Sequence, residues 1–157
     1  MPDKKTKENV KIIAQNRKAR HDYIVLQTFE AGIALEGTEV KSCRNNGVSM
    51  VDCYAVILSG EIWVNNLNIS TYAFGNRNNH EPTRQRKLLM HKQEIARLKR
   101  NIEEKGMTLI PLSMYFKHGR AKVELGLCRG KNVHDKREDL KKKSDQREIQ
   151  RAMNTKR

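Results

Sequence analysis

Alternating hydrophobic and polar positions predict strands over much of the middle of the chain. Residues 23–29 are rich in β-branched and aromatic side chains, and residues 33–35 resume the pattern after a glycine, which predicts a strand with a bulge or bend. Residues 108–116 and 123–127 give two more strands, and the regular alternation of the second is typical of a strand with one buried face. Pro111 lacks an N–H group, which favours a strand end or a sheet edge.

Two further apolar runs, residues 54–58 and 61–64, are joined by a Ser-Gly pair, which is typical of a hairpin. Residues 37–44 predict a short helix that ends at an Asn-Asn-Gly sequence. The clearest helix is predicted over residues 83–105, where apolar positions recur at intervals of three and four. These positions are Leu88, His91, Ile95, Leu98 and Ile102.

These elements predict a mainly β protein with flanking helices. With so few apolar residues, closing the strands into a small OB-like antiparallel β-barrel removes the sheet edges and uses one core, whereas an open sheet capped by one helix is the alternative. The barrel is expected to span residues 12–130, after a loose basic N-terminus at residues 1–11. Residues 131–157 hold five aliphatic and fifteen charged side chains, which predicts a disordered basic C-terminal tail because so little apolar area cannot offset chain entropy.

Positive charge is concentrated in three segments, and this narrows the class of partner. The formal net charge is +14; residues 1–20, 83–105 and 131–157 each carry +5, so the other 87 residues sum to −1. Clustered cations release counterions from phosphates and steer encounter with polyanions, which favours nucleic acid.

Composition limits where the protein works and what it contains. The chain has no apolar run long enough to span a membrane and no apolar stretch typical of a signal peptide, so a cytoplasmic protein without a membrane role is expected. Three scattered cysteines indicate neither a disulfide framework nor a metal site. No cofactor and no metal are expected.

Catalysis is disfavoured by the scattered histidines, which lack the spacing of a metal site, and no phosphate-binding or nucleophile motif is present. A ribonuclease that uses His21 and Asp22, or His134 and Asp135, as general acid and base remains a rival hypothesis. No zinc-finger spacing, leucine zipper or helix-turn-helix pair indicates a DNA-binding protein. Basic arms on a small barrel favour structured or single-stranded RNA, and a general RNA-binding or ribosomal protein is the other alternative.

Blocks in order along nearly the whole chain resemble the SsrA-binding protein family, also called small protein B. The blocks are AQNRKARHDY at 14–23, FEAGIALEGTEVKS at 29–42, HEPTRQRKLLMH at 80–91, KVELGL at 122–127, GK at 130–131 and HDKR at 134–137. The resemblance implies an OB-like barrel with an unstructured tail. It also implies binding to the tRNA-like domain of transfer-messenger RNA and its delivery, charged with alanine, to stalled ribosomes, without an enzymatic step. We expect a monomer.

The resemblance also implies roles for individual residues. The RNA-binding positions that it suggests are Asn16, Arg17, Lys18, Arg20, Glu30, Glu39, Lys41, Lys87, Leu89 and Lys122. Cations would contact phosphates, whereas amide and carboxylate groups would contact base and 2′-hydroxyl edges. A salt bridge is the alternative role for Glu30. Leu89 is expected either in the core or against an unstacked base.

The tail residues that the resemblance implies act at the ribosome. They are Lys131, His134, Asp135, Lys136, Arg137, Ile149, Ala152 and Met153. The proximal ones would lie at the decoding centre, and the distal ones would form a helix in the empty mRNA channel, which an intact message would block. Ala152 stands where a larger aliphatic residue is usual, which weakens the expected distal contact.

Overall fold

The computed structural model describes residues 10–72, 79–130 and 133–155. Its strands are β1 (Val10–Gln15), β2 (Tyr23–Ile33), β3 (Val48–Ser49), β4 (Tyr54–Leu58), β5 (Glu61–Asn65), β6 (Asn68–Ile69), β7 (Arg86–Leu89), β8 (Thr108–Lys117) and β9 (Arg120–Gly130). Its helices are α1 (Arg17–Asp22), α2 (Gly37–Arg44), α3 (Lys92–Lys105) and α4 (Val133–Thr155).

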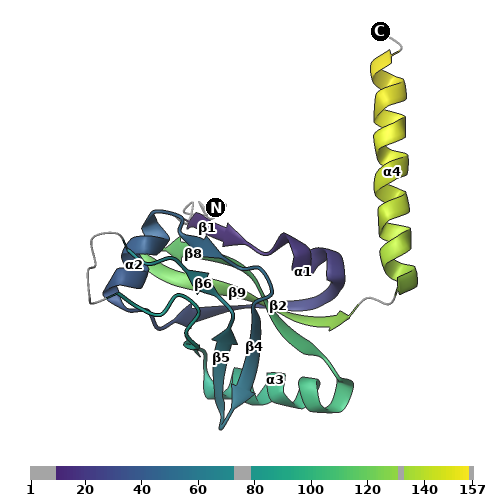
Figure 1. Ribbon diagram of the computed structural model, residues 1–157. Coiled ribbons are helices and arrows are strands. Elements are labelled where there is room, and N and C mark those ends of the chain that lie inside the picture. The colour runs from purple at the N-terminus through teal and green to yellow at the C-terminus, as the bar shows by residue number, and fades with distance from the viewer. Residues whose placement is uncertain (1–9, 73–78, 131–132, 156–157) are drawn as a thin grey trace, which may run out of the picture.

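Six strands form a closed antiparallel ring, in the order β8-β4-β5-β7-β2-β9, because β9 pairs with β8 again. Strand β1 adds to the free edge of β8, and β3 pairs with β6 as a separate short ladder. Figure 1 shows this ring with α1, α2 and α3 placed around it. The predicted small barrel with flanking helices is therefore confirmed, and the open sheet is excluded for the part of the chain that the structure describes.

Local sequence explains the tight turns of the barrel. The predicted hairpin is present as β4 and β5, and its connecting residues Ser59 and Gly60 both have positive φ, 51° and 75°. The β8–β9 hairpin turns in the same way at His118 and Gly119, with φ of 51° and 74°. Turns with two residues of positive φ match the right-handed twist of the flanking strands.

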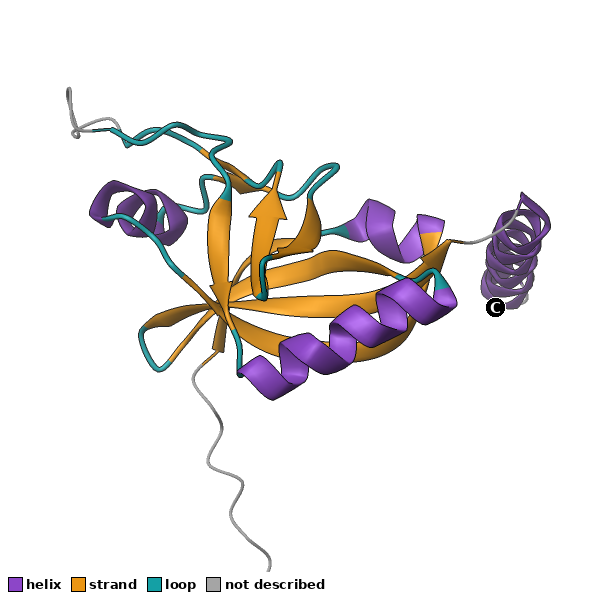
Figure 2. Ribbon diagram, turned by 90° about the horizontal axis from the view of Figure 1, so that it is seen from below, coloured by secondary structure: helices purple, strands orange, loops and turns teal. Residues whose placement is uncertain are grey.

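The core fills the barrel and extends beneath α3. Inward positions such as Ile62, Val64, Leu88 and Leu125 are fully or almost fully buried. The inner face of α3 contributes Ile95 and Leu98 to the same core, and Figure 2 shows α3 lying across the strands. One apolar core thus holds the barrel together, as the sequence predicted.

The predicted helix over residues 83–105 is only partly correct. Residues 92–105 form α3, but residues 86–89 form β7, which pairs with both β5 and β2. Leu88 is buried, yet it points inward from a strand rather than from a helix. The helical spacing of Leu88 relative to Ile95 is a coincidence, because β7 closes the ring and its backbone pairing outweighs local periodicity.

The N-terminal part of the barrel also differs from the sequence expectation. Strand β1 begins at Val10, so two of the eleven residues expected to be loose belong to the sheet. Helix α1 was not predicted; it covers a small outer cluster of Ala19, Ile110, Leu112 and Cys128.

Pro111 lies in the middle of β8, neither at a strand end nor at an edge. It sits at a bulge, between the residue that pairs with β4 and the stretch that pairs with β1. A proline is tolerated where the ladder is interrupted in this way, because the missing N–H breaks no regular pairing.

Residues 133–155 of the tail form one helix, α4. Residues 133–155 contain neither glycine nor proline, and many of them are strong helix formers. Side chains from Leu140 to Met153 are all exposed, and Figure 1 shows α4 standing apart from the barrel. The expectation that the tail has no core of its own therefore holds, although its backbone is helical. None of the described helices combines the length and the apolar content needed to cross a bilayer.

Candidate nucleic-acid interface

The outer face of β7, β2, β9, β8 and β1 carries two rows of side chains. Residues that alternate with these rows, such as Ala31, Val123 and Met114, are buried in the core, so the rows point outward. The first row crosses five strands and contains Leu89, Gly32, Lys122, Tyr115 and Ile12. The second row contains Glu30, Glu124, Ser113 and Gln15. Helix α1 covers the neighbouring part of this face and leaves the two rows accessible.

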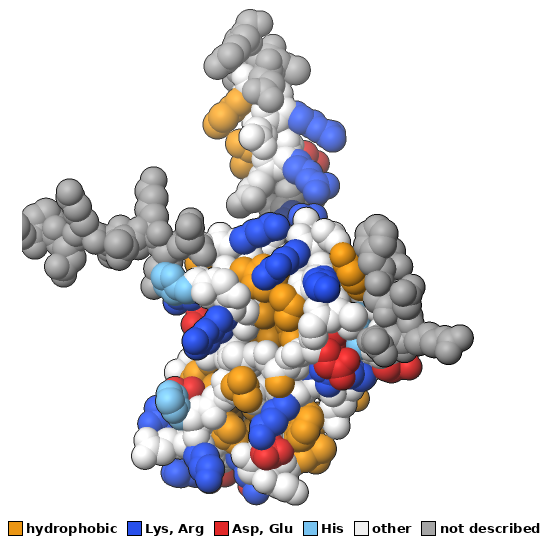
Figure 3. Space-filling view, turned by 90° about the vertical axis from the view of Figure 1, so that its left-hand side faces the viewer, with side chains coloured by type: hydrophobic (Ala, Val, Ile, Leu, Met, Phe, Trp, Pro, Cys, Tyr) orange, Lys and Arg blue, Asp and Glu red, His pale blue; other side chains and the backbone are white. Residues whose placement is uncertain are grey.

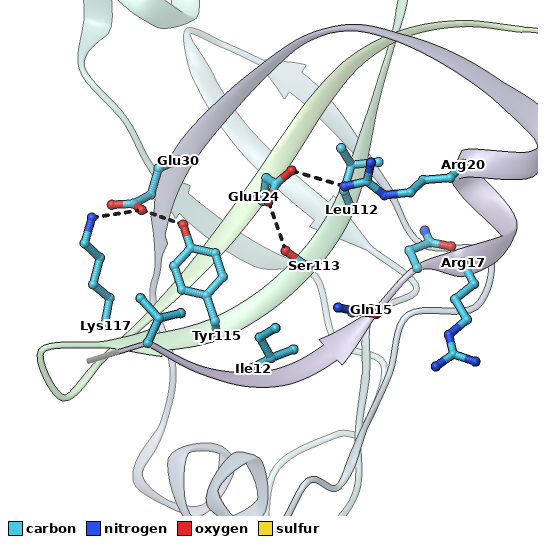
Figure 4. Close-up of a pocket in the computed structure, with 12 residues that line it drawn as sticks. Ile12, Gln15, Arg17, Arg20, Glu30, Leu112, Ser113, Tyr115, Lys117 and Glu124 are labelled. Carbon is cyan, nitrogen blue, oxygen red and sulfur yellow. Dashed lines mark hydrogen bonds and ion pairs between the residues drawn. The ribbon is translucent and has the colours of Figure 1, made fainter. Parts of the chain in front are cut away.

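A hollow of about 440 Å³ lies at the α1 end of these rows, and we call it the glutamate hollow (Figure 4). Its lining residues are Val10, Ile12, Gln15, Asn16, Arg17, Arg20, Glu30, Leu112, Ser113, Tyr115, Lys117 and Glu124. Glu30 and Glu124 stand directly opposite each other on paired strands. Like charges in that position repel, and each carboxylate is stabilised by its own partners.

Both carboxylates of the glutamate hollow are held by hydrogen bonds. The hydroxyl of Tyr115 donates to Glu30, and the ammonium of Lys117 lies 3.5 Å from the same oxygen. Glu124 accepts from Arg20 at 3.4 Å and from the hydroxyl of Ser113 at 3.3 Å. The hydrogen bond from Tyr115, helped by the charge of Lys117, lowers the pKa of Glu30 and outweighs the effect of its partial burial. Glu30 is thus an ionised acceptor, flanked by donors, on an accessible surface.

A second hollow, of about 340 Å³, lies at the other end of the rows, and we call it the leucine hollow. It is lined by Gly32, Ile33, Leu35, Val40, Leu89, Phe116, Gly119, Arg120, Ala121 and Lys122. Figure 3 shows hydrophobic side chains gathered on this side of the molecule, with Lys and Arg side chains around them. Leu89 is 54% exposed, so it does not belong to the core, which was one of its two expected roles.

Six of the ten predicted RNA-binding residues line the two hollows of this face. Asn16, Arg17, Arg20 and Glu30 line the glutamate hollow, whereas Leu89 and Lys122 line the leucine hollow. The two hollows adjoin, because Lys122 pairs across the ladder with Tyr115. The structure therefore brings together residues that are far apart in the sequence.

Three predicted cations lie elsewhere and interact with neighbouring side chains. Lys18 forms an exposed ion pair with Asp52 at 3.1 Å, which raises the pKa of Lys18. Lys87 pairs with Glu61 at 2.9 Å on the β7–β5 side of the barrel. The ammonium of Lys41 lies over the ring of Tyr72, 5.4 Å from its centroid. Exposed pairs of this kind break at small cost, so these lysines remain available to phosphates.

Asn16 lines the glutamate hollow, but its side chain is largely buried and hydrogen-bonded within the protein. Its Oδ1 accepts from the backbone N–H of Ala19 and so caps α1, while its Nδ2 donates to the carbonyl of Pro111 at 3.0 Å. These bonds fasten α1 to the strand that carries the hollow. Asn16 therefore holds in place the helix that carries Arg17 and Arg20, and a direct contact of its amide with RNA stays a prediction.

Glu39 is a correction to the expected set, because the structure buries it completely. Its side chain is 0% exposed, and its two oxygens bind Arg84 and Arg86. Burial alone would raise the pKa of Glu39, but hydrogen bonds from Arg84, from the Glu36 N–H and from Arg86 outweigh it, so the pKa is lowered. Arg86 is also fully buried and donates to the carbonyls of Leu67 and Pro82. This network fixes the segment that precedes β7.

Several residues on the face were not predicted from the sequence. They are Tyr115, Lys117, Glu124, Ser113, Phe116 and Arg120. The alternation of the β9 sequence puts Glu124 and Lys122 on one side of a strand, which was a usable signal. The pairing of Glu30 with Tyr115 and Lys117 depends on the register of three strands, which the sequence did not reveal.

Two of the scattered histidines have hydrogen-bond partners within the protein. His80 is buried, where its Nε2 donates to the carbonyl of Ile69 at 2.7 Å and its Nδ1 accepts from Thr38 at 2.9 Å. The Nδ1 of His21 lies 3.0 Å from the adjacent carboxylate of Asp22. In residues 10–72, 79–130 and 133–155 no group of His, Cys, Asp and Glu is arranged to hold a metal ion.

The predicted tail residues fall into two sets. Lys131 lies outside the described residues, and only the backbone is described for His134, Asp135, Lys136 and Arg137, in the first turns of α4. Ile149, Ala152 and Met153 are exposed on α4. Their spacing of three and four puts them on one side of the helix.

Comparisons with known proteins agree with this arrangement. The model of the family described as SmpB protein matches residues 13–155. This chain belongs to that family. It is 59% identical to the SsrA-binding protein of Saccharopolyspora erythraea over 143 residues, which cover 91% of this chain and 90% of the relative. It is 56% identical to the SsrA-binding protein of Desulforudis audaxviator, covering 93% of this chain and 95% of the relative.

A solved structure of the SmpB family also resembles the fold. It is described as "tmRNA-SmpB: a journey to the center of the bacterial ribosome". The TM-score is 0.65 at 51% sequence identity, and the match covers 76% of this chain and 85% of that chain. The resemblance in sequence blocks that suggested the SsrA-binding protein family is thus confirmed for both sequence and fold.

Proposed function

We propose that this protein binds the tRNA-like domain of transfer-messenger RNA and delivers that RNA to stalled ribosomes in trans-translation. It acts by binding and positioning, without a chemical step of its own. The observation that carries the proposal is the accessible strand face with its two adjoining hollows, in a chain that belongs to the SmpB family. Action at the bacterial ribosome places the protein in the cytoplasm.

The chemistry of the glutamate hollow suits structured RNA. Arg17, Arg20 and Lys117 supply cations for phosphates at its rim. Glu30, which is ionised and accessible, accepts from base N–H groups or 2′-hydroxyls, and these donors distinguish a folded RNA from a plain array of phosphates. A general binder of phosphates would gain nothing from two opposed carboxylates in the middle of its basic face.

The first experiment compares binding of the tRNA-like domain with binding of an ordinary tRNA of similar length at roughly physiological salt, where contacts to phosphates alone weaken. A strong preference for the tRNA-like domain is expected, and it is expected to survive deletion of residues 131–157. Equal binding to both RNAs would leave a general RNA-binding protein. Cleavage of labelled RNA that is lost with His21→Ala would instead favour the ribonuclease hypothesis.

A pair of variants tests the face itself. Arg20→Ala removes an exposed cation from the glutamate hollow, whereas Arg97→Ala removes an exposed cation from α3. We expect the first variant to weaken binding and to reduce the slope of log affinity against log salt by about one, which is the loss of one phosphate contact. The second variant is expected to bind as the wild type does. Equal effects of both changes would refute the placement of the interface.

The tail is proposed to act on the ribosome rather than on the RNA domain. Residues 131–137 would lie at the decoding centre, and the side of α4 that carries Ile149, Ala152 and Met153 would contact the empty mRNA channel. The exposure of Ile149 and Met153, at 57% and 68%, supports the proposal. An occupied channel would exclude α4, which would distinguish stalled ribosomes from translating ones.

Two matched substitutions test the tail. Ile149→Asp puts a carboxylate on the apolar side of α4, whereas Ser144→Asp puts one on the other side of the helix. In a reconstituted reaction on truncated messages, we expect the first variant to bind the tRNA-like domain normally and to lose tagging of the stalled peptide. The second variant is expected to retain tagging. Loss of RNA binding by the first variant would contradict the division of roles.

A further inference from the structure

We infer that the seam between β4 and β8 binds an extended peptide segment of a partner protein, apart from the RNA-binding face. This inference goes beyond the proposed function and does not depend on which RNA is bound. Strands β4 and β8 are neighbours in the ring, yet they are joined by a single residue pair, Ala55 with Leu109. Strand β4 pairs with β5 along its whole length, from Tyr54 to Leu58. The backbone ladder of the ring is therefore shortest at this seam.

Two adjoining hollows lie along the seam, and together we call them the seam groove. One, of about 470 Å³, lies between β4 and α3, and the other, of about 280 Å³, lies between α1 and the start of β4. Tyr54 and Thr108 line both hollows, and Figure 1 shows the β4–β5 hairpin beside α3. The apolar side chains of the larger hollow include Val56, Ile57, Leu58, Ile102 and Met107. Tyr54 and Leu58 are 40% and 52% exposed, and apolar side chains exposed along one groove are typical of a contact surface.

The edge of β4 that faces the groove also offers backbone hydrogen-bonding groups. Leu58 and Glu61 flank the two-residue turn and pair with each other, so Leu58 directs its N–H and C=O to β5. Ile57 therefore directs its own N–H and C=O away from β5, to the side on which Ala55 meets Leu109. None of the described residues pairs with the backbone of Ile57 on that side. An extended peptide that lies along β4 can donate to and accept from Ile57, as in other additions of a strand to a sheet edge.

The charge of the seam groove favours a polypeptide over a nucleic acid. Its charged lining residues are Lys18, Asp22, Asp52, Lys99 and Glu103. Acids thus outnumber cations by three to two in a chain of net charge +14, whereas the leucine hollow has two cations and no acid. At about 0.15 M salt, charges more than about 8 Å away are largely screened, so the acids of the groove decide. They repel a phosphate backbone and favour an apolar segment that carries a basic side chain.

The seam groove and the RNA-binding face lie on two sides of α1. Arg17 and Arg20 line the glutamate hollow, whereas Lys18 and Asp22 line the seam groove. Asn16 is the one described residue that lines both, and its side chain is buried. A peptide in the groove and an RNA on the face can therefore be bound at the same time.

Two synthetic peptides of about six residues, the length of a typical strand, test the inference on the full-length protein by NMR. Both alternate valine and threonine; one ends in lysine at each end, and the other ends in glutamate. At about 0.15 M salt, the lysine peptide is expected to shift the amide signals of residues 54–58 and 107–109 saturably. The glutamate peptide is expected to bind several-fold more weakly. Hydrogen exchange of the Ile57 amide should be fast in the free protein and several-fold slower with the lysine peptide bound.

Leu58→Ala and Leu26→Ala form a matched pair of variants. Leu58 belongs to the wall of the groove, whereas Leu26, which is 48% exposed on β2, does not line it. We expect Leu58→Ala to weaken binding of the lysine peptide by roughly 3- to 10-fold and Leu26→Ala to leave it unchanged. Both variants should bind the tRNA-like domain as the wild type does, and thermal unfolding establishes that both are folded.

The outcomes separate this inference from the proposed function. Amide shifts confined to the strand face, equal binding of the two peptides, or an Ile57 amide that exchanges slowly without peptide would each refute the inference. Displacement of the peptide by the tRNA-like domain, with shifts at Ile57, would make RNA the occupant of the groove. None of these results changes the preference between the two RNAs, which is measured separately. Loss of that preference with peptide binding intact would refute the proposed function alone.

Discussion

Replacing Glu39 by alanine is expected to destabilise the barrel severely, although the residue is charged and was expected on the RNA-binding surface. The substitution removes the partner of Arg86, whose side chain is 0% exposed. Arg86 would keep its bonds to the carbonyls of Leu67 and Pro82, but its charge would remain buried without a carboxylate. An uncompensated charge in a low-dielectric interior is the main cost.

The magnitude follows from the burial of the pair. Breaking a buried ion pair by removing one partner costs about 3–5 kcal/mol, which is a large part of the ~5–15 kcal/mol that holds a typical domain folded. Arg84, the other partner of Glu39, is partly exposed and adds little, because water replaces the carboxylate. The pair of Lys87 with Glu61, with side chains 41% and 46% exposed, gives the contrast, since exposed pairs are worth about 0–1 kcal/mol.

Urea denaturation followed by circular dichroism measures both effects. Glu39→Ala should lower the free energy of unfolding by about 3–5 kcal/mol, or leave the chain unfolded, whereas Glu61→Ala should lower it by less than about 1 kcal/mol. The slope against urea should stay unchanged for Glu61→Ala, because a folded variant exposes the same surface on unfolding. A loss below about 1 kcal/mol for Glu39→Ala would refute the reasoning, since it would mean that water reaches Arg86.

Three further predictions concern pH, capping and thiol reactivity. The pKa of Glu39 is lowered from 4.5, so the ionised carboxylate stabilises the folded protein above pH 4.5, and this stabilisation is lost as the pH falls through the folded-state pKa. In urea denaturation, the difference in the free energy of unfolding between wild type and Glu39→Gln should therefore become smaller as the pH is lowered. Asn16→Ala removes a buried cap of α1 and should cost about 1–2 kcal/mol in the same assay, with Lys18→Ala as a neutral control. Burial raises the pKa of all three thiols, to about 11 for Cys43 and Cys128 and about 12 for Cys53. At pH 8, a thiol reagent should therefore label the three cysteines slowly in the folded protein and rapidly in urea. Rapid labelling without urea would contradict their burial.

Local sequence was sufficient for the elements whose signals are local. The bounds of α2 at residues 37–44 agree with the predicted ones, because a capping box at its start and Asn-Asn-Gly at its end act within a few residues. The β4–β5 hairpin was likewise predicted from its Ser-Gly turn. The family blocks indicated the barrel and six of the residues that line the two hollows of its accessible face.

The sequence by itself thus determined the fold class, the basic character of the chain and its kinship. Only the tertiary structure decided that residues 86–89 are a strand, because their backbone pairs with β5 and β2 when the ring closes. The spacing of apolar residues along the chain contains no information about these long-range partners. It also decided that Glu39 is buried against Arg86, whereas Glu30 is accessible beside Tyr115. Two glutamates look alike in a sequence, and their roles differ because the fold surrounds one with protein and leaves the other in water.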